Sequence, residues 1–135
     1  ISKLIATEEA VSWAKKIGLE NKINQKATLL SGGEMQAIAV ARALITKPKM
    51  LFLDEPTASL DGATKKTIED ILIFASRNGT KILMSTHDLG QAKRLAKDII
   101  FLHRGLVEAH CSKEEFLTEP TSKAAKQFLA GDIVL

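Results

Sequence analysis

The sequence LSGGEMQ at residues 30–36, followed by MLFLDE at residues 50–55, decides the fold. Ser31 and Glu34 have the spacing of a capping box, so a helix is predicted to begin at this glycine-rich turn. Residues 50–53 are apolar without alternation, which predicts a strand covered on both faces of a parallel sheet. The strand ends in two carboxylates. A helix N-terminus beside a strand that carries acids at its tip suits work on a phosphate and its metal ion.

Outward from this stretch, predicted strands alternate with predicted helices. The pattern predicts helices at residues 31–46, 63–77 and 122–130 and strands at residues 81–85, 99–102 and 106–110, the last an antiparallel edge strand. Asp61 is well placed to cap the second of these helices. The alternation indicates an α/β layered domain.

The composition is that of an ordinary globular protein. The chain has 135 residues, of which 45% are apolar and 26% charged, enough for one domain with a core. Aromatic residues make up 4% with no tyrosine, and Lys and Arg are scattered along a chain of net charge +3, so no nucleic-acid partner is expected. A single cysteine, Cys111, excludes an internal disulfide, and no apolar run approaches the roughly 18 residues of a membrane span.

Asp54 and Glu55 are the strongest candidates for chemistry. Open α/β sheets bind ligands at the carboxyl ends of their strands, where these two residues are predicted to lie. Side chains alternate along a strand, so one carboxylate can hold a magnesium ion while the other faces a water that attacks phosphorus. The structural alternative is a pair of exposed loop acids after a core strand. Taken alone, the two residues favour neither interpretation.

The remaining candidates are weaker when each is taken alone. Ser31, Gly32 and Gly33 can present backbone N–H groups to an anion, but a capped helix behind a flexible turn explains them better. His87 lies between a strand and a helix, at the same sheet edge as the two acids if the strands are parallel. Two histidines and the cysteine near the predicted hairpin match no metal pattern and are interpreted as structural.

The order of the motifs is more specific than any one of them. Leu-Ser-Gly-Gly-x-x-Gln, then four apolar residues with Asp-Glu-Pro-Thr, then Leu-Asp, then Ser-Thr-His-Asp resembles the ABC-type ATPases over essentially the whole chain. The resemblance implies ATP and Mg²⁺ as cofactors, with Asp54 as a magnesium partner, Glu55 as the general base and His87 as a γ-phosphate contact. The signature motif would touch a nucleotide held by the opposite subunit. The implied cofactor-binding residues, from the signature and the D-loop, are Ser31, Gly32, Gly33, Gln36 and Asp61.

Two departures from the family pattern shape the interpretation. Ala37 stands where the family usually has arginine, and no Gly-x-x-x-x-Gly-Lys-Ser/Thr phosphate loop or Q-loop occurs in the sequence. The chain therefore resembles the C-terminal portion of a nucleotide-binding subunit. Residues 1–46 would be the end of the helical subdomain and residues 47–135 the rest of the catalytic core.

The implied fold is an incomplete P-loop NTPase (RecA-like) sheet with flanking helices. In this family the phosphate-loop strand lies between the strands predicted at residues 81–85 and 99–102. We therefore expect a gap in the sheet with unpaired strand edges. We also expect the isolated chain to show no measurable ATPase activity.

The resemblance extends to a class of transporter. The residues after His87 and the C-terminal stretch are similar to importers of small solutes, with oxyanions such as tungstate, molybdate or phosphate expected and polar amino acids the neighbouring option. The implied partners are a second nucleotide-binding subunit, arranged head to tail, and a membrane permease. The implied location is cytoplasmic, peripheral on the inner face of the cell membrane. Two alternatives stay open: a non-enzymatic piece that supplies only a dimer surface, and a soluble ABC ATPase of translation or repair.

Overall fold

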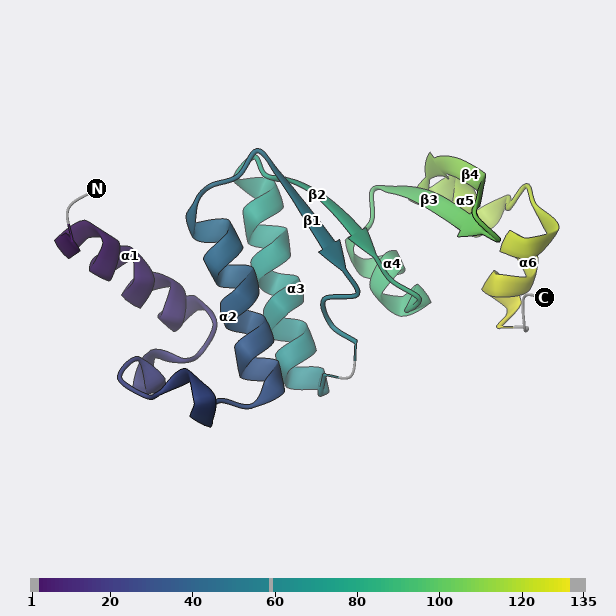
Figure 1. Cartoon of the computed structure of the whole chain (residues 1–135). Helices are drawn as coiled ribbons and strands as arrows, with labels where there is room; N and C mark the ends of the chain where they lie inside the picture. Colours follow the sequence, from purple (N-terminus) through teal and green to yellow (C-terminus); the bar gives the residue numbers. More distant parts are fainter. Residues whose placement is uncertain (1–2, 59, 132–135) are drawn as a thin grey trace. The chain divides into compact units, whose positions relative to one another are not determined.

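A computed structural model describes residues 3–58 and 60–131 of the chain (Figure 1). The chain divides into two compact units, Ile1–Ser85 and Thr86–Leu135, each with its own helices and strands. Within the described residues, none of the helices combines the length and the apolar character needed to cross a membrane. The boundary predicted at residue 46 separates the segment with the signature motif from the rest of the catalytic core, and it does not refer to compact units. It stays a prediction.

The first unit is an α/β layer. Its strands β1 and β2 pair in parallel, in a register that runs from Met50 opposite Lys81 to Asp54 opposite Ser85. Helices α2 and α3 lie side by side next to this sheet (Figure 1). The predicted α/β fold is confirmed. In chain order the elements are α1 (Lys3–Lys16), the short 3-10 helices η1 (Glu20–Lys22) and η2 (Ala27–Leu29), α2 (Gly32–Ile45), β1 (Met50–Asp54), α3 (Gly62–Arg77) and β2 (Lys81–Ser85).

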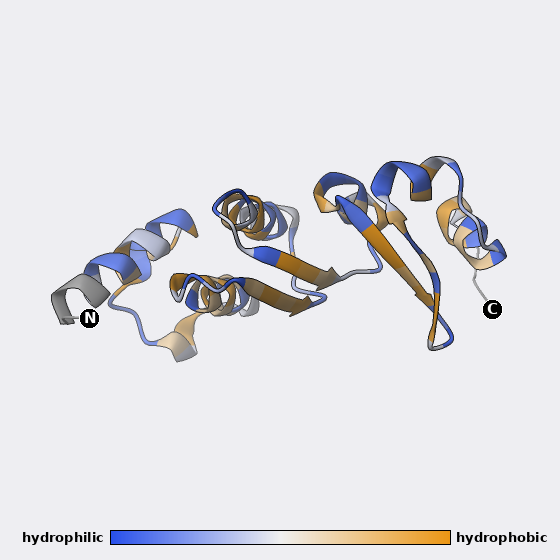
Figure 2. Ribbon diagram, turned by 90° about the horizontal axis from the view of Figure 1, so that it is seen from above, coloured by the Kyte–Doolittle hydropathy of each residue, from blue (hydrophilic) through white to orange (hydrophobic). Residues whose placement is uncertain are grey.

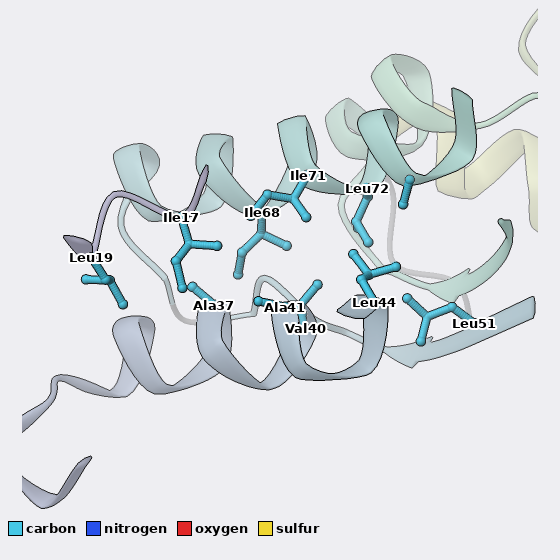
Figure 3. Close-up of a cluster of buried hydrophobic side chains, with 11 residues drawn as sticks. Ile17, Leu19, Ala37, Val40, Ala41, Leu44, Leu51, Ile68, Ile71 and Leu72 are labelled. Carbon is cyan, nitrogen blue, oxygen red and sulfur yellow. The ribbon is translucent and has the colours of Figure 1, made fainter. Parts of the chain in front are cut away.

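The core of the first unit lies between α2, α3 and one face of the sheet. Its members recur at helical spacing on α2 and α3 and at every second position of the strands, so one apolar stripe of each helix meets one strand face. Figure 3 shows these side chains pointing toward one another. The buried residues from the two helices and β1 are Ala37, Val40, Ala41, Leu44, Leu51, Ile68, Ile71, Leu72 and Ala75.

The opposite face of this sheet is exposed, which contradicts the prediction that β1 is covered on both faces. Phe52 is 67% exposed, and Met50 and Leu83 on the same face are 46% and 44% exposed. The described residues place helices against the other face only, where Leu51 is buried. The apolar character of both strands is visible in Figure 2. An unbroken apolar run therefore shows that both faces can be covered, but it does not say by what.

The second unit is built on a β-hairpin. Its elements are α4 (Leu89–Leu95), β3 (Asp98–His103), β4 (Leu106–Ser112), α5 (Lys113–Thr118) and α6 (Lys123–Ala130). The strands pair antiparallel around the turn at Arg104 and Gly105, as predicted, and both turn residues have positive φ. Phe101 on β3 packs against Phe116 and Phe128, with ring centroids 5.5 Å apart in each pair, and this contact attaches α5 and α6 to the hairpin.

The two sheets are separate. Among the described residues β2 pairs with β1 and β3 pairs with β4, and no pairing joins β2 to β3. This agrees with the expected gap between the strands at residues 81–85 and 99–102. Within the described residues, β2 and β3 each have a strand partner on one edge only.

The start of α2 is fixed by a double cap and an ion pair. The Ser31 hydroxyl accepts a hydrogen bond from the Glu34 backbone N–H at 3.2 Å, and the Glu34 carboxylate accepts one from the Ser31 N–H at 2.9 Å. The predicted capping box is therefore confirmed. Lys22 on η1 donates to the other oxygen of the Glu34 carboxylate at 2.6 Å. The hydrogen bond from Lys22, followed by that from Ser31, holds the pKa of Glu34 below its usual value.

We expect Lys22→Met to raise the pKa of Glu34 toward its usual value, because the largest contact of the carboxylate is lost. A carboxyl whose folded pKa is depressed stabilises the fold above its unfolded pKa, and this stabilisation disappears as the pH falls through the folded pKa. The variant should therefore have a lower free energy of unfolding at pH 7. That free energy should also fall less steeply than in the unmodified chain as the pH is lowered below about 4.5. Carboxyl NMR titration and urea denaturation measure the two effects.

Lys113→Met is the matched control for this prediction, because Lys113 pairs with Glu114 at 3.6 Å on another helix. It should leave the pKa of Glu34 unchanged. An unchanged Glu34 pKa in Lys22→Met would contradict the assignment.

We expect a second difference in stability, between the same substitution made in the core and at the surface. Ile68 is fully buried, whereas Ile23 is 46% exposed. Ile68→Val should destabilise the fold by roughly 0.5–1.5 kcal/mol, because it removes a methylene from a packed interior. Ile23→Val removes the same group at the surface and should change little. Urea denaturation compares the two variants, and equal losses would show that the interior between α2 and α3 is not packed as described.

Candidate functional site

The carboxyl ends of β1 and β2 form a polar edge, and Ser85 links the two strand ends by hydrogen bonds. The Ser85 hydroxyl donates a hydrogen bond to the Asp54 carboxylate and accepts one from the Glu55 backbone N–H at 3.0 Å. The parallel register places Ser85 directly opposite Asp54, so this contact joins the tips of the two strands. Both acids have exposed side chains. The prediction that they lie at the carboxyl end of a parallel strand is confirmed.

The backbone turns sharply at Glu55. This residue has φ +41°, a left-handed conformation that costs a non-glycine residue on the order of 1–2 kcal/mol. The surrounding loop holds it: the Ala58 N–H donates to the Glu55 carbonyl at 3.1 Å, and Pro56 and Thr57 are buried. Strained residues held by their surroundings are concentrated at functional sites. The bend comes directly after Asp54, at the tip of β1.

The turn before α2 offers hydrogen-bond donors. Gly32 and Gly33 lie in the first turn of the helix, where the helix itself supplies no carbonyl for their N–H groups. The Ser31 oxygen accepts the bond from Glu34, so its own proton can be donated elsewhere. Gln36 is half-buried one turn later. Ala37, where the family usually has arginine, is 3% exposed and belongs to the core.

Asp61 caps α3 beside this turn. Its carboxylate accepts hydrogen bonds from the Ala63 and Thr64 backbone N–H groups at 2.9 and 3.0 Å and from the Thr64 hydroxyl at 2.7 Å. The Thr64 N–H, followed by its hydroxyl, holds the pKa of Asp61 below its usual value. Thr64 also lies against Gly33 at the start of α2. The structure therefore brings the signature turn and the predicted helix cap together.

His87 lies at the start of the second unit, two residues after the end of β2. It lines a cavity of about 410 Å³ together with Leu89 and residues 128–131. Its predicted position at the sheet edge of the two acids stays a prediction.

Two residues of the site were not predicted from the sequence. Ser85 closes the edge of the sheet, and Thr64 joins Asp61 to Gly33. Ser85 could have been found from its place opposite Asp54, but only if the register of the strand pair had been known. The signal for Thr64 is its position three residues after a capping aspartate, where the first helical turn brings its N–H to the cap.

The donor set at the sheet edge fits a magnesium ion with a phosphate. The described residues contain no group of three His, Cys, Asp or Glu side chains that could hold a metal on their own. Magnesium is commonly held by one or two carboxylates together with phosphate oxygens and water, so a single exposed aspartate with a neighbouring hydroxyl is sufficient. The candidate ligand is Asp54, with Ser85 adjacent.

The chain is similar to known proteins. The ABC transporter family model matches residues 4–58. The arginine/ornithine transport ATP-binding protein AotP of Pseudomonas aeruginosa is 36% identical over 98% of this chain and 52% of its own length. The glutamine transport ATP-binding protein GlnQ of Geobacillus stearothermophilus is 35% identical over 93% of this chain and 52% of its own length.

The fold has a counterpart among solved structures. The structure of an ATP-binding subunit of an ABC transporter superposes with a TM-score of 0.74, over 86% of this chain and 48% of that chain, at 23% identity. The chain spans about half the length of the curated relatives it matches. The motifs, the fold and these relatives together support an ABC transporter nucleotide-binding domain, of which the chain is a part.

Proposed function

We propose that the chain is part of an ATP-binding and ATP-hydrolysing subunit that energises the import of a small polar solute across a membrane. The observation that carries this proposal is the edge at Asp54, Glu55 and Ser85, where one hydroxyl bonds to the Asp54 carboxylate and to the Glu55 backbone at the tip of a parallel strand pair. In this role Asp54 holds the magnesium ion and Glu55 is the general base. His87 contacts the γ-phosphate.

Asp54, Glu55 and Ser85 have different roles at this edge. Bound Mg·ATP supplies the phosphoryl group and neutralises its charge. Ser85 orients the Asp54 carboxylate, because its hydroxyl donates to one carboxylate oxygen and leaves the other for the ion. Glu55 follows Asp54 at the bend, and its carboxylate can accept a proton from the attacking water. The two adjacent acids then have different roles, one as a metal ligand and the other as a base.

The signature turn serves a nucleotide bound by a second subunit. Gly32 and Gly33 provide N–H groups in the first turn of α2, and Ser31 provides a hydroxyl proton. Gln36 and Asp61 complete the cofactor-binding set. The proposed partners are a second nucleotide-binding subunit, arranged head to tail, and a membrane permease. The complex would work at the inner face of the cell membrane.

The relatives favour polar amino acids as the solute. AotP is named for arginine and ornithine, GlnQ for glutamine, and a further relative from Escherichia coli, GltL, for glutamate and aspartate. The oxyanions expected from the sequence have no counterpart among these relatives. We therefore propose a polar amino acid in their place.

The signature turn predicts activity in trans. We expect the chain to restore ATP turnover to intact AotP whose own signature serine has been replaced by arginine, because Ser31 and Gly33 then act on the nucleotide of AotP. The chain alone should show no measurable turnover. Ser31→Ala in the chain should lower the restored turnover roughly tenfold or more, since a preorganised donor to developing charge is lost. Phosphate release measures the rate.

Ser112→Ala is the matched control for Ser31→Ala. Ser112 caps α5 and accepts a hydrogen bond from the Glu115 N–H at 3.2 Å, the same distance as in the Ser31 cap. It should leave the restored turnover unchanged. If the chain restores no turnover, or if Ser31→Ala restores it fully, the proposed role of the signature turn is wrong.

The solute proposal has its own test. Deleting the gene that encodes the chain should lower the uptake of radiolabelled arginine, glutamine or glutamate by the cells, because the importer would lose its energy source. Molybdate uptake in the same cells is the control and should not change. A loss of molybdate uptake with normal amino acid uptake would instead support the oxyanion expectation.

A further inference from the structure

The N-termini of α2 and α3 meet at Gly33 and Thr64. A Cβ atom placed on Gly33 would lie 3.1 Å from the Thr64 Cγ2 methyl, 3.5 Å from its hydroxyl oxygen and 3.6 Å from Leu60. A methyl group at 3.1 Å is closer than carbon atoms normally approach, so Gly33 has room for a side chain only if Thr64 moves. At Gly32 and Gly62, by contrast, an added Cβ meets nothing within 4 Å.

The other end of Thr64 holds Asp61. The Thr64 hydroxyl donates to one Asp61 oxygen at 2.7 Å, and the Thr64 N–H donates to the other at 3.0 Å. Threonine is branched at Cβ, so a single χ1 angle sets the positions of both its methyl and its hydroxyl. A movement of the methyl away from Gly33 must therefore move the hydroxyl relative to Asp61.

We propose that Thr64 is a positioning residue that couples the signature turn to Asp61, with its methyl packed against Gly33 and its hydroxyl bonded to the aspartate. The coupling rests on the proposed function, in which both groups contact a nucleotide. A nucleotide that displaces the turn at Gly33 changes the position of Asp61 through this one side chain. The two motifs then respond together, although they are 28 residues apart in the sequence.

The steric part of the coupling is tested by melting temperature on the full chain. Gly33→Ala should lower the melting temperature by about 4 °C or more relative to Gly32→Ala, which makes the same change where there is space. Adding Thr64→Ser removes the methyl and should recover most of this loss. Adding Thr64→Val instead keeps the methyl and should recover none. If Thr64→Ser and Thr64→Val behave alike in the Gly33→Ala background, the contact is not the cause.

The coupling itself is tested by carboxyl NMR titration of Asp61. Thr64→Val should raise the pKa of Asp61 toward its usual value, because the hydroxyl bond is lost. Gly33→Ala should raise it as well, by displacing Thr64, and the Gly33→Ala/Thr64→Ser variant should restore it. A role confined to packing would lower the melting temperature without moving this pKa. That result would overturn the proposal.

The assay with AotP separates this inference from the proposed function. We expect Thr64→Val and Thr64→Ser each to lower the restored turnover several-fold, because the first removes the hydroxyl bond to Asp61 and the second removes the methyl contact with Gly33. If the unmodified chain restores no turnover, the proposed function fails, and the pKa of Asp61 in Gly33→Ala still decides the coupling. If Ser31→Ala abolishes turnover while Thr64→Val leaves it unchanged, the proposed function stands and the coupling is wrong.

Discussion

The hydroxyl of Ser85 is the contact on which the candidate site depends. It bonds to both Asp54 and the backbone of Glu55, and the parallel register of β1 and β2 places it there. The register in turn is held by the buried stripe of α2 and α3 against one face of the sheet. Because α2 leads into β1 and β1 into α3, both helices begin at the edge where the strands end. The signature turn and Asp61 lie together through Thr64, and the acids lie at the tip of the strand that connects the two helices.

The negative charge of Glu34 at the start of α2 is offset by Lys22. Glu34 caps the helix and carries a negative charge where a phosphate would have to approach. Lys22 bonds to that carboxylate and offsets its charge, so the N–H groups and the helix dipole of the first turn keep their attraction for anions. The capping box thus stabilises the helix, and its negative charge weakens the attraction of the first turn for an anion only a little. Asp61 at the start of α3 carries a negative charge beside this turn.

Local patterns predicted the elements, while the site needed contacts between distant residues. Capping spacing placed the starts of α2 and α3, because a cap involves neighbours in sequence. The prediction for β1 was wrong about its second face, since an apolar run records what a strand can bury and says nothing of the segment that covers it. Ser85 and Thr64 were missed for the same reason. Their partners, Asp54 and Gly33, are set by strand register and helix packing.

We propose that the edge at Asp54 and Ser85 holds a metal ion together with a phosphate. Paramagnetic broadening by Mn²⁺ with ATP, read from the backbone amide signals of the chain, tests it most directly. Glu114 and Glu115 are an adjacent acidic pair on α5 and provide the internal comparison. We predict selective broadening at Asp54, Glu55 and Ser85 that Asp54→Asn abolishes. Equal broadening at both acidic pairs, or broadening that survives Asp54→Asn, would show that this edge does not hold the ion.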